Sequence, residues 1–105
     1  MTEGGSSCIR TRVQVTHDGG LHARPASRVA KCASEFRSDI HLILLSTPIE
    51  MSTPAGTRAD AKNIMDIMLL AAPTGTEIEI EAEGPDAEAA VERLEALFKD
   101  RFGLS

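Results

Sequence analysis

The residues best suited to chemistry lie together at positions 20–26, where the sequence reads Gly-Leu-His-Ala-Arg-Pro-Ala. His22 is predicted to stand at the start of a helix, because proline is well tolerated in a first turn, whose amides have no partner within the helix. Those amides and the positive end of the helix dipole then face the imidazole. A phosphoryl group on the ring would meet the backbone N–H groups of Ala23 and Arg24 and the Arg24 guanidinium. The predicted chemistry is reversible phosphorylation of His22.

Two other interpretations of the histidines compete with this one. A single histidine near a turn is more often a solvated or capping side chain than a reactive one. The complete run favours the reactive interpretation because an alternating segment precedes it and a helical pattern follows it. A metal site made of His17, His22 and His41 is the second alternative, but their spacing matches no common ligand pattern. We therefore predict neither a metal nor a cofactor.

Composition limits the possible partners and the compartment. The chain has 105 residues and a net charge of −5, which argues against nonspecific binding to nucleic acid or anionic lipid. Basic residues concentrate in the first 37 positions, so a basic face near His22 is expected, suited to phosphate and acidic partners. There is no signal-peptide pattern and no apolar run of membrane-spanning length. Cys8 and Cys32 are therefore interpreted as free thiols of a cytoplasmic protein without membrane insertion.

Hydrophobic periodicity predicts one mixed domain over residues 8–105, after a flexible tail at 1–7. Alternating or apolar runs predict strands at 9–15, 40–45, 57–61 and 77–83. Helical spacing predicts a helix after His22, a short helix at 64–69 that Asn63 caps in a box-like arrangement with Asp66, and a last helix that begins near 86 and carries its apolar stripe toward Phe102. Two prolines make 46–56 a long loop or an irregular hairpin.

The run at 20–26 resembles the active-site signature of HPr, the histidine-containing phosphocarrier family of the phosphoenolpyruvate-dependent sugar phosphotransferase system. A second similar stretch is 61–68, Ala-Lys-Asn-Ile-Met-Asp-Ile-Met, and the resemblance covers about residues 9–102. It implies an α+β fold, an open-faced β-sandwich of order β-α-β-β-α-β-α. The four antiparallel strands would lie in the order 1-4-2-3, with three helices on one face.

The resemblance also implies a function. Enzyme I would phosphorylate His22 at Nδ1, and the protein would pass the group to the A domain of a sugar-specific enzyme II. The nearby helix start and Arg24 should disfavour protonation of the ring and keep it nucleophilic. The alternative is a regulatory, nitrogen-type carrier whose phosphorylation state controls other proteins. Either would be a stoichiometric carrier rather than a turnover enzyme, and a monomer with transient partners.

Several positions refine the resemblance. Asn63 stands where many relatives have a regulatory serine, so kinase control at this position is not expected, and Asp66 stands where glycine is frequent. The segment 46–56 exceeds a tight hairpin and is interpreted as a tolerated insertion rather than a partner-specific feature. Partner docking is predicted at four residues, Leu21, Ala26, Ile64 and Met65. Met68 is assigned to the core.

Overall fold

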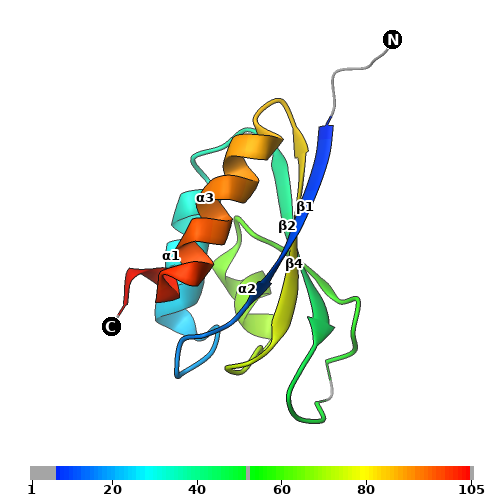
Figure 1. The fold of residues 1–105 in the computed structure, drawn as a ribbon, viewed down its shortest axis with the longest axis vertical. Coiled ribbons are helices and arrows are strands. Elements are labelled where there is room, and N and C mark those ends of the chain that lie inside the picture. Colours follow the sequence, from blue (N-terminus) through cyan, green and yellow to red (C-terminus); the bar gives the residue numbers. More distant parts are fainter. Residues whose placement is uncertain (1–6, 52, 105) are drawn as a thin grey trace.

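The computed structural model describes residues 7–51 and 53–104, and Figure 1 shows how the elements follow one another. The strands are β1 (Ser7–Gln14), β2 (Asp39–Ser46), β3 (Arg58–Asp60) and β4 (Glu77–Gly84). The helices are α1 (Ala23–Ala33), α2 (Ile64–Leu69) and α3 (Ala87–Lys99), followed by a 3-10 turn (Arg101–Gly103). The antiparallel sheet has the order β1-β4-β2-β3, so the predicted fold class and strand order are confirmed.

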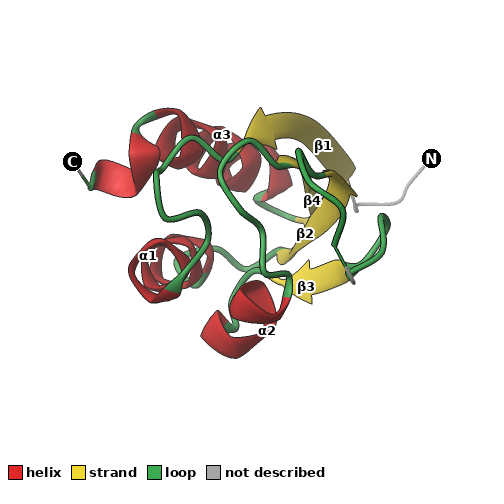
Figure 2. Ribbon diagram, turned by 90° about the horizontal axis from the view of Figure 1, so that it is seen from below, coloured by secondary structure: helices red, strands yellow, loops and turns green. Residues whose placement is uncertain are grey.

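The sheet separates a buried face from an open one. Along β4, Ile78, Ile80 and Ala82 are fully buried, while glutamates alternate with them on the other side. The three helices cover the buried face and leave the other to solvent, as Figure 2 shows. On the open face, Glu81 pairs with Arg10 at 2.9 Å and with Arg58, and the Arg58 contact is the main reason that its carboxyl pKa is lowered.

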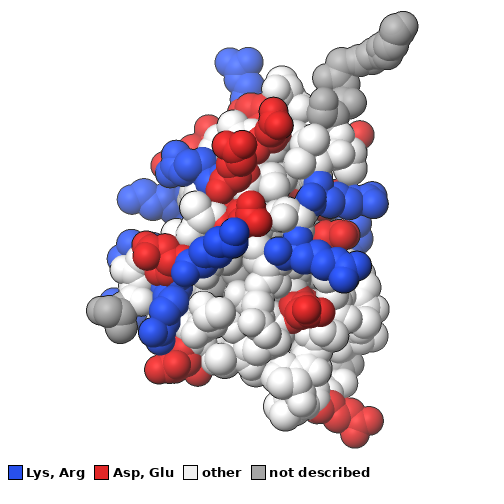
Figure 3. Space-filling view, viewed as in Figure 1, with Lys and Arg blue, Asp and Glu red and all other residues white. Residues whose placement is uncertain are grey.

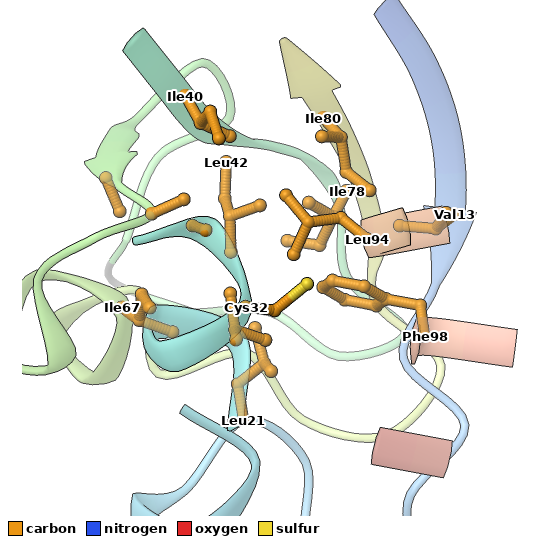
Figure 4. Packing of buried hydrophobic residues seen from close by; sticks show 14 of the residues in the cluster. Val13, Leu21, Cys32, Ile40, Leu42, Ile67, Ile78, Ile80, Leu94 and Phe98 are labelled. Atoms are coloured by element: carbon orange, nitrogen blue, oxygen red, sulfur yellow. The ribbon is translucent and has the colours of Figure 1, made fainter. Parts of the chain in front are cut away.

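Aliphatic side chains fill the space between the sheet and the helices. Figure 4 shows Leu42 and Ile80 from the sheet and Leu94 and Phe98 from α3 in one cluster. A fully buried side chain of this size contributes about 1.5–3 kcal/mol relative to an exposed one. Cys32 belongs to the same cluster, and burial raises the pKa of its thiol. It is a free thiol, as is the exposed Cys8 in β1.

Two features differ from the predicted elements, and a third agrees with its prediction. The tail expected at 1–7 lies outside the described residues up to position 6, and residue 7 already belongs to β1. The connection from β2 to β3 projects from the sheet as an extended loop (Figure 1), which is one of the two forms predicted for 46–56. Helix α3 ends at Lys99, and Phe102 is buried from the following turn at a φ of 62° rather than from the helix.

The outer surface is charged unevenly. Acidic and basic side chains are interspersed over the face with α3 and β1, whereas the lower end of the same view is mostly uncharged (Figure 3). Within the described residues, no helix is long and apolar enough to cross a membrane.

Candidate active site

His22 is the N-cap residue of α1, as its place before the proline predicted. Its backbone is extended, with φ −83° and ψ −165°, and its carbonyl accepts the first helical hydrogen bond from Ala26 N at 2.9 Å. The imidazole is exposed and makes no capping hydrogen bond. Because Pro25 has no N–H and the amide of Ala26 is already bonded, Ala23 and Arg24 carry the first-turn amides that an anion could reach.

Two glycines shape the loop that presents the ring. Gly20 has a φ of +70°, and a Cβ there would lie 2.4 Å from the carbonyl oxygen of Ala72. This close approach lets Leu21 N donate to the same oxygen at 2.9 Å, which fixes the loop to the segment before β4. A residue with a side chain at position 20 would therefore be both strained and obstructed.

Gly19 contacts the imidazole directly. A Cβ at this position would lie 2.5 Å from both Cδ2 and Nε2 of His22. That edge of the ring therefore packs against the Gly19 backbone, and Nδ1 lies on the opposite edge of the ring. Sequence alone could not distinguish the two nitrogens, because the distinction depends on how the loop folds around the ring.

The structure brings two of the three histidines together. The ring centroids of His17 and His22 are 5.4 Å apart, with the planes tilted by 55°, whereas His41 belongs to β2 and is paired in register with Asp60 and Glu81. Within the described ranges, no group of three or more histidine, cysteine or acidic residues could hold a metal ion. The fold therefore does not bring together His17, His22 and His41, the three histidines considered above as a metal site.

Helix α1 presents a basic surface beginning at the site. Arg24, Arg28 and Lys31 are all exposed, and the first turn contains no acidic residue. In the part of the chain that the structure describes, Arg24 forms no ion pair. Its guanidinium is therefore free to contact an anion bound at His22.

The four residues predicted to dock partners differ in exposure. Ile64 and Met65 are exposed, at 41% and 67%. The prediction that Leu21 and Ala26 contact partners is wrong, because their side chains are only 3% and 0% exposed. Leu21 points into the cluster in Figure 4. A loop residue next to an exposed histidine is easily mistaken for a surface residue, but here its side chain anchors the loop in the core.

Helix α2 exposes more apolar surface than the sequence analysis assigned. Met68 is 38% exposed, so its assignment to the core was wrong, and Leu69 is 72% exposed. Met68 also lines a shallow pocket of about 360 Å³ together with His22, Gly19, Leu21 and the segment 71–73. The four exposed residues are spaced i, i+1, i+4 and i+5 on one side of the helix. That spacing is visible in the sequence, but in a six-residue helix with five apolar residues it does not show which side is buried.

The start of α2 also differs from its predicted form. The Asn63 side chain accepts a hydrogen bond from Asp66 N at 3.1 Å, which confirms the cap. The Asp66 carboxylate does not return a bond to Asn63 N, as a capping box would require. It accepts instead from Asp60 N at 3.2 Å, which ties α2 to β3.

An open-faced α+β protein that presents an exposed histidine at a helix start without a side-chain cap, beside an exposed arginine, has the features of a small phosphoryl-carrying domain. The chain belongs to the HPr family, because residues 9–100 match the family described as the PTS HPr component phosphorylation site. The protein thereby has the role of a phosphocarrier in the phosphotransferase system.

Individual relatives match over nearly their whole length. The phosphocarrier protein HPr of Treponema pallidum is 39% identical over 86% of this chain and 91% of its own. The crystal structure of HPr-C-His from Thermoanaerobacter tengcongensis matches with a TM-score of 0.77 and 32% identity, covering 92% of this chain and 98% of that one. The phosphocarrier protein HPr from Bacillus anthracis matches with a TM-score of 0.70 and 40% identity, covering 86% and 95%.

Proposed function

We propose that His22 accepts a phosphoryl group at Nδ1 from phosphorylated enzyme I and donates it to the A domain of a sugar-specific enzyme II. The observation that carries this proposal is the exposed imidazole at the open start of α1, with its Cδ2–Nε2 edge against Gly19 and Nδ1 on the other edge. A phosphoryl group on Nδ1 stays accessible to partners, whereas one on Nε2 would collide with the loop.

The transfer needs little from the protein beyond position and charge. The Nδ1 lone pair attacks phosphorus, a P–N bond forms, and the bond from phosphorus to the donor breaks with its electron pair returning to the donor. The N–H groups of Ala23 and Arg24, together with the Arg24 guanidinium, stabilise the charge on the three phosphoryl oxygens. The same step in reverse delivers the group to the next acceptor.

Partner docking uses the apolar side of α2. Ile64, Met65, Met68 and Leu69 are exposed beside the pocket that contains His22. Flexible methionine side chains suit a surface that must fit more than one partner. The basic side of α1 adds attraction for acidic partner surfaces, and the protein acts as a cytoplasmic monomer that binds its partners transiently.

A regulatory, nitrogen-type carrier is the second candidate, and the start of α2 favours it. Asn63 offers no hydroxyl where many relatives carry the regulatory serine, and Asp66 is held by Asp60 N beside the docking side. A panel of A domains separates the candidates. Phosphoryl transfer to a sugar-specific A domain supports the first, and transfer confined to a nitrogen-type A domain supports the second.

The test of the proposal is incubation with phosphoenolpyruvate and enzyme I, followed by intact mass measurement beside a known HPr. We expect one acid-labile phosphoryl group on the wild-type protein. His22→Ala should remove it completely, while His41→Ala, a matched histidine in β2, should retain it. An unmodified wild-type mass alongside a labelled control protein would contradict the proposal.

A further inference from the structure

Three aromatic rings connect the hydrophobic core to the candidate active site. Phe98 and Phe102 are in edge contact with centroids 4.8 Å apart, and both are fully buried. The ring of Phe102 lies 6.3 Å from that of His17, again edge-on. His17 in turn lies 5.4 Å from His22. The His22 ring is thus the exposed end of a row of ring contacts that begins in the core.

The turn that carries His17 is held by several hydrogen bonds. The carbonyl oxygen of His17 accepts from Gly20 N at 2.9 Å and from the Thr74 hydroxyl, which also donates to the carbonyl of Asp18 at 2.8 Å. Nδ1 of His17 accepts from Gly19 N at 3.3 Å. In the neutral ring this contact assigns the proton to Nε2. Backbone and side chain together therefore fix where the His17 ring stands.

The C-terminal turn reaches the same loop at a conformational cost. Arg101 and Phe102 have φ values of 52° and 62°, which are unfavourable for residues other than glycine. Such backbone persists only where surrounding contacts compensate. Here Phe102 is buried behind His17, and Arg101 pairs with Asp18 at 3.4 Å. Both strained residues thus contact the turn that precedes His22.

From these contacts we propose that His17 is a positioning residue for His22. Its ring, backed by Phe102, sets the orientation of the imidazole, which makes no capping hydrogen bond of its own. Gly19 limits the ring at one edge and His17 at its side, so Nδ1 keeps one direction for in-line transfer. The inference rests on the proposed function for its consequence, because orientation matters most when phosphorus must lie on the line of attack.

Two substitutions separate ring contact from the hydrogen bond of the turn. His17→Asn keeps an acceptor for Gly19 N, because the amide oxygen takes the place of Nδ1, but removes the ring. His17→Phe keeps a ring and removes the acceptor. If His17 acts through ring contact, Phe preserves the orientation of His22 and Asn does not. If it merely stabilises the turn, the order is reversed.

The first measurement uses the unmodified protein, so that it does not depend on phosphorylation. Three-bond couplings of His22 report whether its side chain holds one rotamer or averages over several. We expect a single rotamer in the wild type and in His17→Phe, and averaging in His17→Asn, with all three proteins equally folded by circular dichroism. A single rotamer in His17→Asn, or averaging in His17→Phe, overturns the inference.

The second measurement is the rate of phosphoryl transfer from phosphorylated enzyme I. With this protein as the substrate of enzyme I, we expect His17→Asn to lower the kcat of the transfer about tenfold and to leave KM unchanged. The kcat for His17→Phe should stay within about twofold of the wild-type value. A wild-type protein that takes up no phosphoryl group counts against the proposed function alone, because the rotamer result still decides the role of His17. Equal rates in a phosphorylated wild type and His17→Asn count against the positioning role.

Discussion

The N-cap residue of α2 is Asn63, whose side chain accepts a hydrogen bond from Asp66 N, whereas the N-cap residue of α1 is His22, whose side chain makes no capping hydrogen bond. Helix α3 is tied to its surroundings as well. The carboxylate of Asp86, the residue before its first turn, accepts from Arg37 N and Ser38 N at 2.9 Å and from the Ser38 hydroxyl at 2.6 Å. The Asn63 side chain thus caps the first turn of α2, and the Asp86 side chain ties the α3 start to residues 37–38 without bonding the first-turn amides of α3. The His22 side chain neither caps α1 nor ties its start to another segment by a hydrogen bond within the described residues.

Under the proposed function, the difference between α1 and α2 separates a reactive from a structural use of the same backbone geometry. Each α-helix leaves its first amides unbonded, and a side-chain oxygen at the N-cap stabilises a protein by about 1 kcal/mol. At α1 that stabilisation is forgone, and Pro25 removes one amide altogether. The remaining amides of Ala23 and Arg24 face solvent beside His22. The open start is therefore interpreted as an anion site that a cap would block.

The most direct test of this difference removes a first-turn amide N–H of α1 without adding a cap and without unfolding the helix. Ala23→Pro does so, because proline is favoured at the first helical position and the extended backbone of His22 is compatible with a following proline. We expect phosphoryl transfer from enzyme I to fall about ten- to a hundredfold. The free energy of unfolding should change by less than about 0.5 kcal/mol.

The control for this variant is Ala23→Gly, which retains the amide. Stopped-flow transfer kinetics and urea unfolding on the same preparations give both quantities. If Ala23→Pro transferred at the wild-type rate while Ala23→Gly did too, the first-turn amide would have no part in the reaction.

The sequence predicted the fold well where side-chain pattern alone decides it. The alternation along β4 and the cap at Asn63 are local signals, and both were confirmed. The site was predicted at His22, but its surroundings were not. The contact between His17 and His22, the position of Gly19 and the burial of Leu21 depend on how the loop is tied to Ala72 and Thr74, residues about 50 positions away in the chain. Such contacts leave no periodic pattern to detect.

The capped start of α2 allows the same difference to be tested through stability. Asn63→Ala removes the acceptor for Asp66 N and should lower the free energy of unfolding by about 1 kcal/mol. Asn63→Ser restores an acceptor and should recover most of that loss. His22→Ala should cost less than Asn63→Ala, because the His22 side chain caps nothing. Equal losses in the two alanine variants, measured by urea unfolding, would mean that the α1 start is not open in solution.

The smallest expected effect concerns acid stability at the α3 start. Hydrogen bonds from the Ser38 hydroxyl and then from Arg37 N lower the pKa of the Asp86 carboxyl in the folded protein. A group whose pKa is lower when folded stabilises the protein above its unfolded pKa, about 3.9 for aspartate, and this stabilisation disappears as the pH falls through the folded value. The Tm difference between the wild type and Asp86→Asn should therefore be largest near neutral pH and shrink below about pH 4.

Glu81 on the open face of the sheet provides the matched comparison for that measurement. Its carboxyl pKa is lowered chiefly by Arg58 and also by Arg10, so its contribution has the same sign and is lost over the same acid range. The partners differ in charge, however. Contacts with arginine are screened by salt, whereas those of Asp86 with a hydroxyl and with amides are screened much less. In about 1 M NaCl the Tm difference for Glu81→Gln should shrink and that for Asp86→Asn should persist. If both differences shrank alike, charge rather than hydrogen bonding would hold the α3 start against residues 37–38, and the difference between Asp86 and the unbonded His22 side chain would be one of electrostatics.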